Sequence, residues 1–151
     1  MRNCTYYPNL GTLNAQPKQI ISTLLDHQQL HRFFNAKFTL LQAQDEGQIE
    51  GGKGSVRQVK IGKITFSEQI ISADQNQISY QIVGDKPVAN HRGDIYLTAN
   101  KDINTLVTEL NYCISCSAPW WMPNALLKYV ITKDITQALN NLNNYFLAGK
   151  V

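Results

Sequence analysis

The sequence has little charge, few cysteines and no long apolar run. Only 17% of its 151 residues are charged, against about 25% in typical domains. No apolar stretch approaches the roughly 18 residues that a membrane-spanning helix needs. Three cysteines are too few for a disulfide framework, and an odd number is typical of free thiols. These absences argue against a transmembrane protein and against a small disulfide-rich secreted domain.

Basic charge is also modest. There are 14 basic and 11 acidic residues, which gives a net charge of +3. The densest basic segment contains Lys53, Arg57, Lys60 and Lys63 with apolar residues between them, and a solvated hairpin is the favoured interpretation. We therefore expect no nucleic-acid partner. The first residues contain no apolar stretch of the kind found in secretory signals, so a cytoplasmic location is predicted.

Metal-binding and cofactor motifs are lacking. Cys113 and Cys116 form a CxxC, but in a strand residues three apart point to opposite faces, so the two sulfurs do not converge. His27 and His31 have the spacing of zinc ligands on a helix, yet no third ligand is evident and a solvated face is favoured. There is no phosphate-binding glycine loop, G-x-S-x-G or HExxH motif. We expect no metal and no cofactor.

The sequence does contain 43% hydrophobic residues, enough to give one domain over residues 1–151 a sizeable core. A weak first strand at 4–13, interrupted by Pro8 and Gly11, precedes a helix that starts at 14–17. Asp26 is a candidate cap for a second short helix carrying Leu30, Phe33 and Phe34.

Six further strands are predicted, separated by short glycine-rich or polar turns. They span 36–45, 54–61, 64–73, 77–84, 89–99 and 104–117. After Pro123, apolar residues recur every three or four positions as far as Phe146, which predicts a long helix ended by Gly149. The fold class is therefore α+β: a curved antiparallel sheet of about seven strands wraps around a long C-terminal helix, with two short helices after the first strand.

Each predicted inward strand face carries a polar exception among apolar neighbours, namely Arg57, Glu68, Tyr80, His91 and Tyr112. Buried polar groups are the informative ones. If Gly62-Lys63 is a two-residue hairpin turn, Ile61 faces Ile64, and counting back by two places Arg57 opposite Glu68. Their Cβ atoms should then be about 5 Å apart. This pair either satisfies itself or anchors a polar group of a ligand.

Three segments resemble the START-like, SRPBCC superfamily, whose fold is the helix-grip, and within it the polyketide cyclase/dehydrase-like branch. They are Gly54-Ser55-Val56-Arg57, then Phe66-Ser67-Glu68-Gln69-Ile70, and the stretch from Tyr80 through Pro87 to Gly93. The resemblance implies a cavity between sheet and helix for a small hydrophobic or aromatic molecule, lipid- or polyketide-like. His91 stands where relatives often carry tyrosine, and Glu109 where they often carry tryptophan.

The leading hypothesis is accordingly a binding protein for such a ligand. The alternative is a cyclase- or dehydratase-type enzyme that uses His91 or Glu68 as acid or base. The predicted ligand-binding residues are Arg57, Glu68, Tyr80, His91, Tyr112, Phe66, Leu127, Val130, Ile131 and Ile135.

Trp120, Trp121 and Met122 lie between two prolines ahead of the long helix. They either seal the core, form a lid over the cavity, or make a weak membrane contact. The loop at 84–90 is the other candidate gate. The chain is expected to be a monomer, or a homodimer paired through its first strand.

Overall fold

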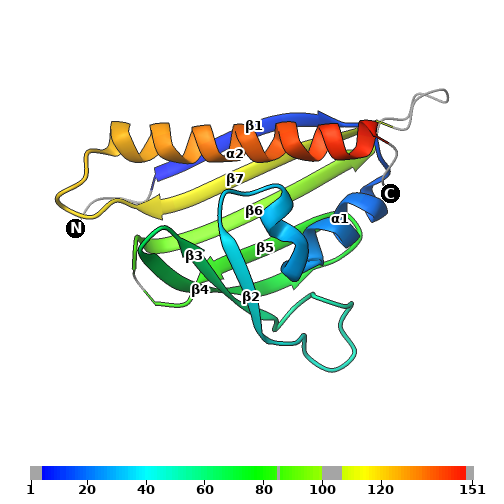
Figure 1. Cartoon of the computed structure of the whole chain (residues 1–151), viewed down its shortest axis with the longest axis horizontal. Helices are drawn as coiled ribbons and strands as arrows, with labels where there is room; N and C mark the ends of the chain where they lie inside the picture. Colours follow the sequence, from blue (N-terminus) through cyan, green and yellow to red (C-terminus); the bar gives the residue numbers. More distant parts are fainter. Residues whose placement is uncertain (1–4, 85, 100–106, 149–151) are drawn as a thin grey trace.

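The computed structural model describes residues 5–84, 86–99 and 107–148, with side chains from residue 10 onward (Figure 1). Its elements follow the predicted order. They are β1 Thr5–Leu13, α1 Pro17–Leu25, the 3₁₀ helix η1 His27–Arg32, β2 Lys37–Gln42, β3 Val56–Ile61, β4 Ile64–Ala73, β5 Gln77–Ile82, β6 Ala89–Ala99, β7 Thr108–Ser117 and α2 Asn124–Leu147.

The strands form one curved antiparallel sheet in the order β1-β7-β6-β5-β4-β3-β2. Consecutive strands from β2 to β7 are neighbours, as short turns require, and β1 adds to the far edge beside β7. The predicted first strand is confirmed in its described part, Thr5–Leu13. Four predicted strands are longer than the observed ones. The strand β2 spans Lys37–Gln42, β3 begins at Val56, β5 ends at Ile82 and β7 begins at Thr108, while residues 104–106 lie outside the described part.

The long helix α2 runs along β1 on one face of the sheet (Figure 1). Gly11 explains how it approaches the interrupted strand so closely. A Cβ atom at this position would come within 3.1 Å of Leu139 Cδ1, which is tighter than ordinary packing allows. The sheet, α2 and the two short helices together form the predicted helix-grip fold, with its core between them.

One face of α2 is buried against the sheet and the other is exposed. The buried face consists of Leu127, Ile135, Ala138, Leu139, Leu142 and Phe146, and Ile131 is partly buried. Val130 was expected on this face, but it is 43% exposed. At 100° per residue it points about 120° away from the centre of the buried face. The proposed end of the helix at Gly149 lies outside the described residues.

The second short helix differs from the expected one in two ways. It is a 3₁₀ helix that ends at Arg32, so Phe33 and Phe34 follow it, and the side chain of Asp26 makes no capping hydrogen bond. Phe33 is nevertheless buried and stacks edge-to-face on Tyr145 of α2, with ring centroids 5.3 Å apart. The segment between η1 and β2 therefore joins the core as a turn and not as helix.

Candidate ligand-binding site

The β3–β4 hairpin sets the geometry of the site. Ile61 pairs with Ile64 and Gly62 has a φ of +60°, which suits a turn with glycine first. Arg57 consequently lies directly opposite Glu68, as the register predicts. Arg57 Nε donates to Glu68 Oε1 at 2.9 Å, and Arg57 Nη2 lies 2.8 Å from the same oxygen. Both residues are 7% exposed, so this ion pair is buried.

Burial lowers the pKa of Arg57, but the charge of Glu68, the two neighbouring tyrosines and the hydrogen bond to Glu68 together outweigh it, so the net shift of the pKa is upward. The guanidinium also lies over two aromatic rings. Its Cζ lies 5.1 Å from the centroid of Tyr80 and 5.4 Å from that of Phe38. Such contacts stabilise a cation that has lost water. Arg57 is therefore charged and held in place from several directions.

His27 supplies a third contact to this cation. Arg57 Nη1 donates to His27 Nδ1 at 3.1 Å, and His27 Nε2 lies 2.8 Å from the carbonyl oxygen of Gly51. A carbonyl can only accept, so the proton is on Nε2 and the lone pair of Nδ1 faces Arg57. Burial and the charge of Arg57 lower the His27 pKa to about 4. The imidazole is neutral near pH 7 and acts as an acceptor.

The expectation that His27 lies on a solvated face is wrong, because it is only 3% exposed. Its helix is 3₁₀, where residues four apart diverge by about 120°, so exposed His31 faces elsewhere. The sequence offered one signal, since an inward arginine has more N–H groups than a single carboxylate can bind. That signal does not identify the residue that accepts a hydrogen bond from Arg57 in addition to Glu68.

Two buried tyrosines continue the cluster of polar side chains around Arg57 across the sheet. The hydroxyl groups of Tyr80 and Tyr112 hydrogen-bond to each other, and their rings are edge-to-face. Burial raises the pKa of both phenols, so each remains protonated. Gly93, opposite Tyr80 on β6, makes room for this ring, because a Cβ there would lie 2.3 Å from Tyr80 Cζ.

His91 borders this group. Its ring centroid lies 5.6 Å from that of Tyr80. Its Nδ1 atom is buried and has no hydrogen-bond partner within the described residues. Burial lowers the pKa of His91, partly offset by Glu68. A buried nitrogen without a partner is costly, so this atom is a candidate contact for a bound molecule.

A cavity of about 130 Å³ lies between the sheet and α2. Six predicted residues line it, namely Arg57, Glu68, Phe66, Tyr80, Tyr112 and Ile135. The other four do not line it. His91 lies beside the Tyr80 ring, Leu127 and Ile131 lie earlier on α2, and Val130 points outward. Phe34, Phe38 and Asp134 also line the cavity, although the sequence pattern did not predict them there. Partial burial raises the pKa of Asp134.

The cavity volume limits what fits. A dry cavity of about 150 Å³ can hold benzene, whereas pockets for drug-sized ligands measure about 300–1,000 Å³. As it stands, the cavity admits a ring-sized group. A lipid or polyketide chain would need an outward movement of α2 or of the Phe34–Phe38 pair, whose rings meet edge-to-face at 6.1 Å.

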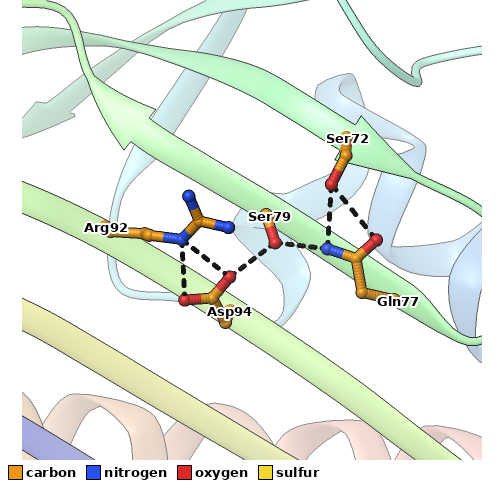
Figure 2. Close-up of polar contacts among 5 residues, drawn as sticks. All are labelled: Ser72, Gln77, Ser79, Arg92 and Asp94. Atoms are coloured by element: carbon orange, nitrogen blue, oxygen red, sulfur yellow. Dashed lines mark hydrogen bonds and ion pairs between the residues drawn. The ribbon is translucent and has the colours of Figure 1, made fainter.

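The opposite face of the sheet carries a separate polar network (Figure 2). Ser79 donates to Asp94 at 2.5 Å, and Arg92 Nε lies 3.0 Å from both Asp94 oxygens. Gln77 connects Ser79 to Ser72. All these groups satisfy one another across β4, β5 and β6. We therefore interpret the network as structural.

The structure also bears on the predictions for the tryptophan loop, the cysteines, metal binding and membrane-spanning helices. The interpretation that Trp120, Trp121 and Met122 seal the core is wrong for the two tryptophans, which are 86% and 62% exposed, whereas Met122 is partly buried against the core. Cys113 and Cys116 are both buried, and Cys113 Sγ donates a hydrogen bond to Asn111 Oδ1 at 3.2 Å. Within the described residues, no three His, Cys, Asp or Glu side chains gather as a metal site would require. In the same part of the chain, no helix is long and apolar enough to cross a bilayer.

Comparison with known proteins bears on the fold alone. No family model matches the chain, and no curated protein matches it in sequence. The chain is similar to the solved structure of an uncharacterized protein from Bacillus thuringiensis, with a TM-score of 0.69, 14% identity and coverage of 95% of this chain and 99% of that one. It is also similar to the protein XoxI from Bacillus cereus, with a TM-score of 0.71, 14% identity and coverage of 97% and 99%. These likenesses confirm the predicted fold.

Proposed function

We propose that this protein binds a small hydrophobic or aromatic molecule with an oxygen acceptor, in the cavity between the sheet and α2. One observation carries the proposal: a buried guanidinium lines a cavity whose other walls are largely aromatic or aliphatic. A guanidinium has five N–H groups. Glu68 and His27 account for at most three of them, so Arg57 retains donors for a carbonyl, hydroxyl or carboxylate.

The helix-grip fold and the three segments described above support membership of the START-like, SRPBCC superfamily, in its polyketide cyclase/dehydrase-like branch. Membership is part of the proposal, since the structural likeness at 14% identity concerns the fold. The volume of the cavity limits the size of the ligand. A single ring or a short branched chain fits the present volume, and a longer lipid- or polyketide-like ligand requires the cavity to open.

Native mass spectrometry of freshly purified protein tests this proposal, because a retained ligand reports its own mass. Where none is retained, binding of a library of small aromatic ketones and acids is measured by ligand-observed NMR. The decisive variant is Arg57→Met/Glu68→Leu, which removes both charges together. Replacing a buried ion pair with apolar residues of similar size is often nearly neutral for stability, so lost binding is not lost folding.

Arg92→Met is the matched control, because Arg92 pairs with Asp94 on the other face of the sheet. We expect the control to bind like the wild type and the double variant to bind at least tenfold more weakly. Equal binding by wild type and double variant would show that the Arg57–Glu68 pair is structural only.

A cyclase- or dehydratase-type activity remains the second candidate. The observation that favours it is the buried Nδ1 of His91 beside Tyr80, for which the described part of the chain supplies no hydrogen-bond partner. A neutral imidazole with a free nitrogen can take up a proton from a substrate. Glu68 is less suited to this role, since it is already paired with Arg57. Turnover of poly-β-keto substrates that is lost in His91→Phe would support an enzyme, and binding without turnover would support a carrier.

We also propose a weak membrane contact through Trp120 and Trp121, since both indoles are exposed in the loop ahead of α2. Indole rings favour the boundary between water and lipid. A cytoplasmic location is also part of the proposal, because an odd number of cysteines, three, is typical of a reducing compartment.

A further inference from the structure

Exposed apolar side chains continue from the tryptophan loop onto α2. Leu126, Tyr129 and Val130 are 49%, 62% and 43% exposed. At 100° per residue they fall within an arc of about 100° on one side of the helix, away from buried Leu127 and Ile135. The first turns of α2 are thus apolar on the side that faces solvent as well as on the side that faces the core. Scattered exposed apolar residues are ordinary, but a contiguous group marks an interaction surface.

Positive charge accompanies this apolar surface. At 100° per residue, Lys133 falls within the arc of these side chains. Lys128 lines one surface depression of about 840 Å³ together with Tyr129 and Lys133. Between Glu109 and Asp134 the sequence has no acidic residue. The combination of aromatic rings at the tip and lysines on the flank is complementary to a surface that is apolar inside and negative at its boundary.

We propose that these residues form a docking face for an anionic lipid bilayer. The docking face consists of Trp120, Trp121, Leu126, Tyr129 and Val130, with Lys128 and Lys133 beside them. This inference rests on the proposed membrane contact of the two tryptophans and adds the lipid class and the rest of the surface. The rings enter the boundary between headgroups and acyl chains, and the lysines meet lipid phosphates and carboxylates.

A second copy of the chain fits this face less well. In a symmetric dimer the same patch meets itself, which would bring the lysines of both copies toward one another. An anionic bilayer has no such conflict, since it supplies the opposite charge over the whole face.

The tryptophans themselves provide the measurement. The chain has two, and both belong to the docking face, so intrinsic fluorescence reports on this surface without a label. Full-length protein is mixed with phosphatidylcholine vesicles, with or without phosphatidylserine, and co-sedimentation is measured alongside. We expect a blue shift and co-sedimentation with the anionic vesicles, and at most a weak response with the neutral ones. Added salt should weaken the binding, because it screens the lysines.

Two variants separate the apolar and charged contributions. Trp120→Ala/Trp121→Ala should abolish co-sedimentation. Lys128→Gln/Lys133→Gln should weaken binding to anionic vesicles about 30-fold, since each lysine near such a surface contributes roughly fivefold. All four side chains are exposed, so the variants should melt like the wild type.

Matched controls come from exposed residues elsewhere. Leu10→Ala/Tyr96→Ala removes two exposed apolar side chains that flank Asn111 on the sheet. Lys60→Gln/Lys63→Gln removes two exposed lysines of the β3–β4 hairpin. Both controls should bind anionic vesicles like the wild type.

Three results would overturn the inference. Equal binding to neutral and anionic vesicles would refute the lipid class while leaving the membrane contact in place. No response to either vesicle would refute both. A blue shift that grows with protein concentration without vesicles would make a second copy the occupant. Ligand binding in the cavity is read separately by native mass spectrometry, so none of these results is confused with failure of the ligand proposal.

Discussion

The two faces of the sheet each carry an arginine–carboxylate pair, in opposite surroundings. Arg57 and Glu68 face α2, and both side chains are 9% exposed. Arg92 and Asp94 lie on the other face, where the Arg92 side chain is 51% exposed (Figure 2). The contacts have similar lengths, 2.8 Å and 3.0 Å. Because the contact lengths are similar, we expect burial to decide how much stability is lost when either pair is broken.

The largest loss of stability should come from removing one partner of the buried Arg57–Glu68 pair. Glu68→Leu leaves the buried Arg57 charge facing only neutral groups, so the free energy of unfolding should fall by about 3–5 kcal/mol. Urea unfolding followed by circular dichroism measures this. Arg57→Met/Glu68→Leu should recover most of the loss. If Glu68→Leu has the same free energy of unfolding as the wild type, then water solvates the Arg57 charge and the pair is not buried as described.

The second prediction uses pH to perturb the buried ion pair through its neighbour His27. Burial and Arg57 lower the His27 pKa to about 4, from about 6.5 in an unfolded chain. Between these values the unfolded state binds the extra proton, so stability rises with pH. The contribution of neutral His27 is complete above pH 6.5 and is lost toward pH 4, by about 3 kcal/mol in total.

Unfolding curves of the wild type and of His27→Gln, measured from pH 7 to pH 4, check the assignment. The wild type should lose stability more steeply than the variant. The remaining slope in the variant should include His91, whose pKa is also lowered by burial. Parallel curves would mean that His27 is not the group that titrates.

A third prediction concerns the room that Gly93 leaves for Tyr80. Gly93→Ala places a methyl group 2.3 Å from Tyr80 Cζ. The ring must move, and with it the hydroxyl contact to Tyr112, so we expect a loss of about 1–3 kcal/mol. Gly47→Ala is a useful contrast, since its Cβ meets nothing within 4 Å although its φ of +80° adds some strain. Equal melting temperatures for Gly93→Ala and the wild type would contradict the packing described.

The smallest loss of stability is expected for the exposed Arg92–Asp94 pair. Arg92→Ala removes the partner of Asp94, but Ser79 still donates to that carboxylate and water reaches it. Exposed pairs contribute about 0–1 kcal/mol, so the change in unfolding free energy should stay below about 1 kcal/mol. A loss as large as that of Glu68→Leu would show that the two faces of the sheet do not differ as the burial indicates.

The strand faces and one hairpin turn were sufficient to predict the central contact. Alternation put Arg57 and Glu68 on the inward face, and the Gly62-Lys63 turn set their register, because a slip of one residue would reverse every side chain. The same reasoning failed for His27 and Val130. In both cases the helix type or helix phase decides which way a side chain points, and a single sequence indicates neither with enough precision.

The sequence by itself determined the fold and the polar residues of the inward face, because periodicity, turn chemistry and length act locally and are written in neighbouring residues. Only the tertiary structure decided that His27 accepts from Arg57, that Phe34 and Phe38 close the cavity, and that the space left is ring-sized. These facts depend on how η1, the sheet and α2 meet. Packing between distant segments sets burial, and burial sets the charge state of His27 and the energetic weight of each pair.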